Sequence, residues 1–88
     1  MFTLIGITKD DEGTQMRVCG TFEELGDARA FMNSEWWDGF KEEREWTDDP
    51  DRIVGVCNDW HAWIRGGDLY EESRWAILDP VHNPTFRM

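Results

Sequence analysis

The alternation of hydrophobic and polar residues in the first twenty positions predicts two strands. Phe2–Thr8 is apolar and β-branched, which is typical of a strand. Gln15–Gly20 alternates with a period of two and places Met16 and Val18 on the same face, as in a half-buried strand. The polar stretch Lys9–Thr14 separates these segments and contains a glycine. We therefore expect an antiparallel hairpin with the Val18 face turned towards the core.

A helical pattern follows the hairpin. Leu25, Ala28, Met32 and Trp36 recur at spacings that place them on one face of a helix. The apolar face rotates after this stretch, so we expect a bend or break near residues 33–34 or 38–39. Pro50 ends the pattern, because proline lacks the N–H that a helix interior requires.

The helix start has two readings that fit the sequence equally. Thr21 can act as the N-cap with Glu24 at the third helical position, which makes a capping box. A later start near Glu24, with Asp27 at the third position, fits as well. Either start places acidic side chains in the first turn, where the helix dipole favours them.

The second half of the chain predicts further strands. Ile53–Cys57 is either a strand or a buried loop, Trp60–Arg65 alternates as a strand does, and Arg74–Leu78 is the last strand. Asn58-Asp59 and residues 66–68 have turn chemistry, residues 69–73 form a polar loop, and residues from about 80 to 88 are a tail.

These elements predict an α+β fold in a single domain, residues 1–88. We expect an antiparallel sheet of about four strands in ββ-α-ββ order, with one long helix packed on one face. The inward spacings predict one shared core made of Val18, Phe22, Leu25, Ala28, Met32, Trp36, Ile64 and Ile77.

Charge narrows the possible partners. The chain has 88 residues with 19 acidic and 9 basic side chains, a net charge of −10 and a pI near 4.4. This balance argues against direct binding to nucleic acid or to an anionic membrane surface, and favours a basic partner. No signal peptide or apolar run of spanning length occurs, so we expect a cytoplasmic protein, in the host cell cytoplasm if a phage encodes it.

Catalytic and metal-binding motifs are not apparent in the sequence. Cys57, Asp59 and His61 recur at every second position, with Cys19 and His82 elsewhere, but zinc sites usually have paired Cys or His spacings. Cysteines of this kind more often pack as small buried hydrophobes. We therefore expect no enzyme activity, no metal, no cofactor and no disulfide.

The strongest functional signal is an acidic, tryptophan-rich segment, residues 35–51. It contains eight acidic residues and two basic ones, a net charge of −6. Such a run is often only a solvated helix face. Tryptophan beside charge, however, is the composition of interface hot spots. The candidate partner-binding residues are Glu35, Trp37, Asp38, Glu42, Glu43, Glu45, Trp46, Asp48, Asp49 and Asp51.

A resemblance supports the fold and suggests a class of function. The run Gly20-Thr21-Phe22-Glu23-Glu24-Leu25-Gly26-Asp27-Ala28-Arg29-Ala30, followed by Arg74-Trp75-Ala76-Ile77-Leu78, resembles small acidic proteins of phages and gut bacteria. Anti-CRISPR inhibitors are drawn from proteins of that size and charge. The resemblance covers roughly half the chain and implies a hairpin joined to a helix. It transfers no functional residue.

These observations suggest an acidic binding protein, monomeric, that inhibits a basic nucleic-acid-handling protein by occupying its nucleic-acid site. A Cas effector or a nuclease would be such a partner. Two alternatives stay open: an immunity or antitoxin protein for a nuclease, and a structural or assembly protein of a phage.

Overall fold

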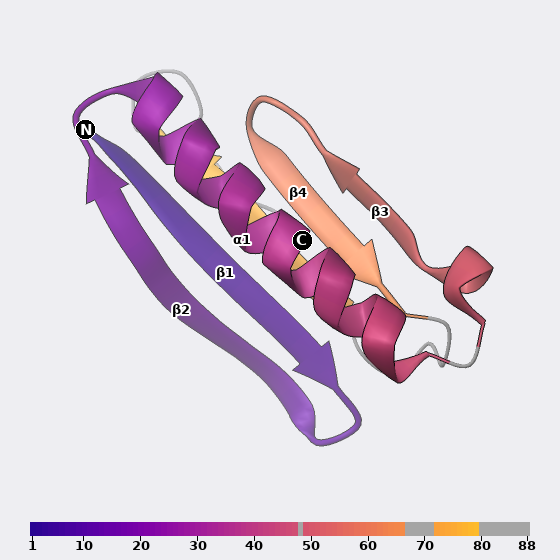
Figure 1. Cartoon of the computed structure of the whole chain (residues 1–88). Coiled ribbons are helices and arrows are strands. Elements are labelled where there is room, and N and C mark those ends of the chain that lie inside the picture. The colour runs from indigo at the N-terminus through magenta and orange to yellow at the C-terminus, as the bar shows by residue number, and fades with distance from the viewer. Residues whose placement is uncertain (48, 67–71, 80–88) are drawn as a thin grey trace.

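The computed structural model describes residues 1–47, 49–66 and 72–79 of the chain. In this part of the chain one helix lies across one face of a five-stranded antiparallel sheet (Figure 1). The elements, in chain order, are β1 (Phe2–Asp10), β2 (Gly13–Phe22), α1 (Leu25–Trp46), the 3₁₀ helix η1 (Pro50–Arg52), β3 (Val54–Cys57), β4 (His61–Arg65) and β5 (Glu72–Leu78).

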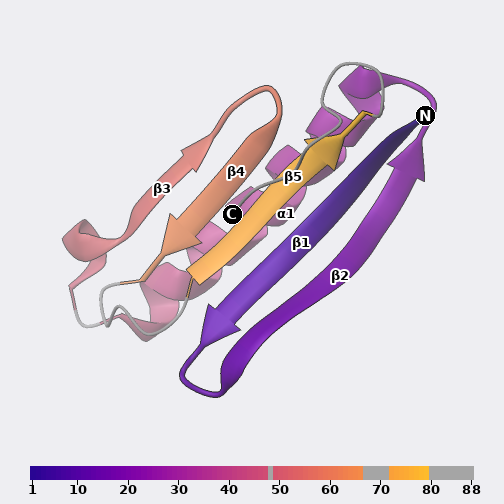
Figure 2. The same cartoon turned by 180° about the vertical axis from the view of Figure 1, so that it is seen from behind.

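The last strand in the sequence lies in the centre of the sheet. The strand order is β2-β1-β5-β4-β3, so β5 pairs with β1 on one side and with β4 on the other (Figure 2). The N-terminal hairpin and the β3–β4 hairpin therefore join into one sheet only through β5. All four pairings are antiparallel.

The predicted α+β class, the N-terminal hairpin and the helix are confirmed. The sheet has five strands where about four were expected, because Val54–Cys57, for which both a strand and a buried loop were open, forms a strand. Val54 pairs with Arg65 and Cys57 with Ala62 along β4. The element order is thus ββ-α-βββ. Residues 67–71 of the predicted turn and loop, and the predicted tail 80–88, lie outside the described residues.

Helix α1 is continuous, and the predicted bend or break is wrong. It has 22 residues and starts after Glu24, which is the later of the two predicted starts. The rotated apolar face is accommodated because the large rings of Trp36 and Phe40 reach the core from the flank of the helix. Gly39 lets the helix approach the sheet closely: a Cβ atom there would lie 3.3 Å from Ile64 Cδ1.

The core lies between α1 and the sheet. Leu4, Met32 and Ile77 are its largest fully buried side chains. Seven of the eight predicted core residues are found there; they are Phe22, Leu25, Ala28, Met32, Trp36, Ile64 and Ile77. A second, smaller cluster of Ile5, Ile7 and Ala76 lies on the sheet face away from α1, which we call the open face.

Val18 is the exception, and its predicted place in the core is wrong. Its side chain is 65% exposed, because the register of β1 with β2 shifts between Leu4 and Ile5 and sets Val18 opposite Ile5 on the open face. Arg17 occupies the helix side instead and forms an ion pair with Glu35 at 3.5 Å. The predicted alternation of side chains along this strand is confirmed. The prediction that α1 covers the face of Val18 is wrong, because α1 covers the face of Arg17.

Two glycines of α1 give a matched test of this packing. A Cβ atom at Gly26 meets nothing within 4 Å, whereas one at Gly39 meets Ile64 and Trp75. We expect Gly26→Ala to raise the free energy of unfolding by about 0.4–1 kcal/mol through the loss of unfolded-state freedom. Gly39→Ala should raise the free energy of unfolding by less than this or lower it, because the Ile64 side chain must move to make room for the new methyl group. Denaturant unfolding measures both, and a larger gain at Gly39 would contradict the close approach.

Candidate functional site

Three acidic side chains lie on the solvent face of α1: Asp38, Glu42 and Glu45. All three are exposed. At about 100° per residue they fall within an arc of about 60°. Asp38 and Glu45 lie about 120° and 140° around the helix from the buried Met32, and Glu42 lies about 80° from it. Seven residues separate the first from the last, a rise of about 10 Å along the helix. We call this set the carboxylate line.

The negative charge of the carboxylate line is only weakly compensated. Asp38 lies 3.7 Å from Lys41, but both side chains are about 70% exposed, at 74% and 68%. Such exposed pairs contribute little because water screens them. Glu42 and Glu45 form no ion pair with any described residue. The end of α1 therefore presents a net negative surface.

Two of the predicted partner-binding residues are engaged elsewhere. Glu35 is turned towards β2, where Arg17 neutralises part of its charge, and its side chain is only 33% exposed. Glu43 is half-buried on the sheet side of α1, so close to Gly66 that a Cβ atom there would meet its carboxylate. Sequence spacing could not show either contact, since both partners come from distant strands or their ends.

The three acidic candidates that follow α1 are Asp48, Asp49 and Asp51. Asp49 caps η1, and its carboxylate accepts a hydrogen bond from the backbone N–H of Asp51 at 3.2 Å. Asp51 itself is exposed. Asp48 lies outside the described residues. Asp49 and Asp51 are both exposed and extend the negative surface beyond the helix.

The tryptophans of the segment have separate roles. Trp36 is half-buried, and its indole N–H donates to the carbonyl oxygen of Trp63 at 3.1 Å. Trp37 is 50% exposed and Trp46 is 78% exposed. By helical geometry the latter two lie about 90° to either side of the carboxylate line. Trp37 is held edge-on against Trp36 and Phe40, with ring centroids 5.1 and 6.0 Å apart.

Sequence reasoning missed Asp27 as a member of this face. It is exposed in the first turn of α1. Eighteen residues, or five full turns, separate it from Glu45, so both point the same way. Asp27 was read only as a charge that suits the helix dipole. The spacings of 11 and 7 residues from Asp27 to Asp38 and on to Glu45 would have revealed it.

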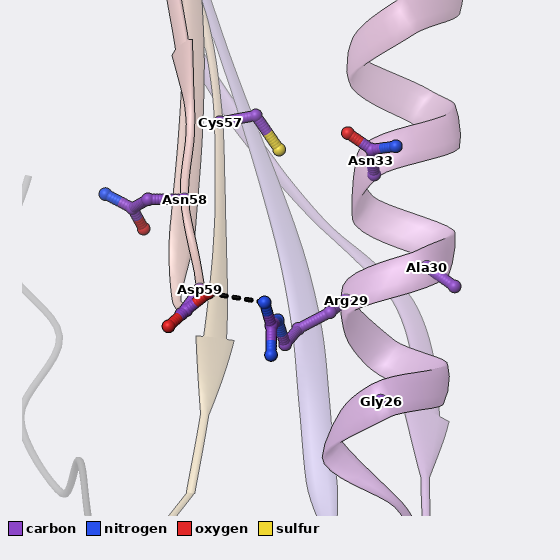
Figure 3. A pocket seen from close by; sticks show the side chains of 7 residues that line it. All are labelled: Gly26, Arg29, Ala30, Asn33, Cys57, Asn58 and Asp59. Carbon is purple, nitrogen blue, oxygen red and sulfur yellow. Dashed lines mark hydrogen bonds and ion pairs between the residues drawn. The ribbon is translucent and has the colours of Figure 1, made fainter.

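A groove lies between the first half of α1 and the turn that joins β3 to β4 (Figure 3). Its volume is about 410 Å³, and its lining residues are Gly26, Arg29, Ala30, Asn33, Cys57, Asn58 and Asp59. Arg29 crosses it to pair with Asp59 at 2.5 Å. The Asn58 carboxamide holds the predicted turn by accepting from the backbone N–H groups of Trp60 and His61.

The geometry of the groove does not favour thiol chemistry. Cys57 faces α1 whereas His61 lies on the open face, because Cys57 pairs with Ala62 and His61 with Ala76. Burial raises the pKa of the Cys57 thiol, and nearby Arg29 offsets only part of the rise. No group of three potential metal ligands occurs among the described residues, and His82 lies outside them.

Cys19 is in a similar state on the other side of α1. Burial is the largest cause of the raised pKa of its thiol, while Arg17 lowers and Glu35 raises that pKa by smaller amounts. Both cysteines are free thiols. Because thiolates are the reactive form, neither side chain is an activated nucleophile at neutral pH.

Comparisons with protein-family models, with curated proteins and with solved structures found no match. Among the described residues, no helix combines the length and the apolarity needed to cross a membrane. The arrangement of the site is therefore the basis for assigning a function.

Thiol reactivity tests the protonation of the two cysteines. At neutral pH we expect Cys19 and Cys57 to alkylate more slowly than the same thiols in denaturant, because raised pKa values leave less thiolate. The rate in the folded protein should increase as the pH rises through and beyond the ordinary thiol range near 8.5. Fast alkylation of the folded protein that does not change with pH would contradict this state and indicate an activated thiol.

Proposed function

We propose that this chain is an acidic inhibitor that inserts the solvent face of α1 into the positively charged nucleic-acid site of a Cas effector or a nuclease. The exposed, uncompensated carboxylates of Glu42 and Glu45 beside Asp38 carry the proposal. An immunity or antitoxin protein for a nuclease would act by the same mechanism. No catalysis by this chain is required.

The dimensions of the carboxylate line suit a short stretch of nucleic acid. Phosphates follow each other about every 3.4 Å of axis along one DNA strand. Three carboxylates over about 10 Å of helix therefore span the axial length of about four successive phosphates of one strand. Arg and Lys side chains that bind phosphate oxygens form the same charge-assisted hydrogen bonds with carboxylates. Competition would thus be both electrostatic and steric.

Charge alone would give little selectivity among basic partners. The exposed rings of Trp37 and Trp46 supply the rest of that selectivity. Trp37 is held by two neighbouring rings, so little side-chain freedom is lost when a partner covers it. Tryptophan is enriched among the residues that dominate interface energies. Trp46 flanks the opposite side of the line and is more exposed. We infer that a partner contacts the carboxylates and at least one of these rings together.

The test is displacement of duplex DNA from a panel of Cas effectors and nucleases. Wild-type protein should displace DNA from its partner, and less effectively as salt rises, because salt screens exposed charges over about 8–10 Å. Glu42→Lys with Glu45→Lys should lose most of this displacement, mainly through slower association. The fold should survive, since charge reversal on an exposed helix face costs little.

A matched control changes the same charge at another place. Asp11 and Glu12 are exposed at the β1–β2 turn, which is held by the Asp10 carboxylate and the backbone N–H groups of residues 12 and 13. Asp11→Lys with Glu12→Lys should therefore leave folding and displacement near wild type. Equal loss in both double variants would show that only net charge matters. If the helix variant displaces DNA as well as wild type does, the carboxylate line is only a solvated helix face and the proposal is wrong.

A further inference from the structure

The outer edge of the sheet at β2 has no neighbour among the described elements. β2 is the first strand in the sheet order and lies on the outside of the sheet (Figure 1). All residues of Thr14–Val18 are exposed, and the apolar side chains of Met16 and Val18 are 69% and 65% exposed on the open face. An exposed edge of this kind is a template for another strand, because its outward N–H and C=O groups have no strand partner in the described part of the chain.

Features that usually protect an edge are not found along Thr14–Val18. The segment has no proline and no lysine. Its single charged side chain, Arg17, turns to the helix side and pairs with Glu35. The register irregularity between β1 and β2 comes only beyond Val18. The opposite edge of the sheet is different, because β3 has only four residues.

The side chains of this segment are arranged symmetrically about Met16. Thr14 and Val18 are both β-branched and of similar shape, and Gln15 and Arg17 are both long and polar. The first pair lies with Met16 on the open face, and the second pair lies on the helix side. Read backwards, the segment therefore presents the same kinds of side chain at each position and on each face.

We propose that two copies of this chain pair through β2, antiparallel, about a twofold axis at Met16. Met16 then lies opposite the Met16 of the second copy, each Thr14 opposite a Val18, and each Gln15 opposite an Arg17. Directly opposed side chains of these kinds stabilise an antiparallel pair, and no like charges face each other. The same surface serves both copies, as a twofold interface requires. The two sheets become one continuous sheet.

The charge of the chain determines how this association depends on salt. Each copy has a net charge of −10, and the paired segment contains no acidic residue. General repulsion between the copies opposes pairing at low ionic strength, so pairing strengthens as salt rises. The proposed binding of α1 to a basic partner has the opposite salt dependence. The two proposals use different surfaces and can fail separately.

The contact is small, so the dimer is weak. Five residue pairs with a few exposed side chains bury less than the roughly 1,200 Å² of a stable interface. The chain is then a monomer in dilute solution, as the sequence suggested, and a dimer when concentrated. Sheet extension leaves the carboxylate line of each copy exposed, because the second copy adds in the plane of the sheet and the line lies on α1.

Sedimentation equilibrium of the whole chain over a range of protein concentrations tests the proposal. Wild type, Met16→Lys and Val56→Lys are each measured at low and at high salt. Wild type should show a monomer–dimer equilibrium whose dissociation constant falls as salt rises. Met16→Lys sets two charges against each other at the axis and should raise the dissociation constant at least tenfold. Val56→Lys, a 40% exposed position on the open face of β3, should leave it unchanged. Circular dichroism establishes that both variants fold.

Disulfide trapping gives a second, positional readout. In a chain with Cys19→Ser and Cys57→Ser, Met16→Cys should form a covalent dimer under a mild oxidant, because opposed Cβ atoms lie about 4.5–5.5 Å apart and the strands adjust slightly to bond. Val56→Cys in the same background should react far more slowly. A wild-type protein that stays monomeric at every concentration would overturn the proposal. Equal trapping at both positions would overturn it as well.

Discussion

The packing of one helical stripe against the centre of the sheet determines the rest of this structure. Ala28 and Met32 of α1 are fully buried, and they share the core with Ile64, Trp75 and Ile77 of the central strands. A helix that buries one stripe must expose the opposite one. The position of Met32 in the core therefore turns Asp27, Asp38 and Glu45 to solvent. The acidic face follows from the hydrophobic register, whether or not a partner uses it.

The same packing explains why the charges of α1 are not equivalent. Acidic residues on the flanks of the buried stripe meet other elements: Glu35 meets Arg17 of β2, and Glu43 lies against Gly66 after β4. On the solvent face, Asp38 meets only the exposed Lys41, and Glu42 and Glu45 form no ion pair with a described residue. Only the latter retain the uncompensated charge on which the proposed competition with nucleic acid depends. The interface is thus narrower than the acidic segment of the sequence.

Local patterns were sufficient to predict the elements that depend on neighbouring residues. The helix register, the hairpin at the N-terminus and the turn at Asn58 follow from spacing and turn chemistry, and the structure has them. Spacing left two helix starts open, and the structure has the later one. Features set by distant pairings were not predictable in this way. The place of β5 between β1 and β4 depends on β1, which is far away in the sequence. The exposure of Val18 depends on which face α1 covers.

In the candidate site, too, some features follow from local sequence spacing and others depend on tertiary contacts. The sequence named Asp38, Glu42 and Glu45 as candidates together with Glu35 and Glu43, and helical spacing could also have added Asp27. It could not separate these residues from Glu35 and Glu43, since their compensation comes from tertiary contacts. It also could not show that Trp36 is fixed by the Trp63 carbonyl while Trp37 stays half-exposed. Exposure and ion pairing, and not sequence position, decide which acids can meet a partner.

Carbodiimide labelling of carboxylates, in the free protein and in complex with the partner from the displacement panel, tests the central claim most directly. If the solvent face of α1 occupies a basic site, labelling of Asp38, Glu42 and Glu45 should fall strongly on binding. Labelling of Asp11 and Glu12 at the β1–β2 turn should stay the same. Protection at the turn with continued labelling of the carboxylate line would contradict the proposed interface.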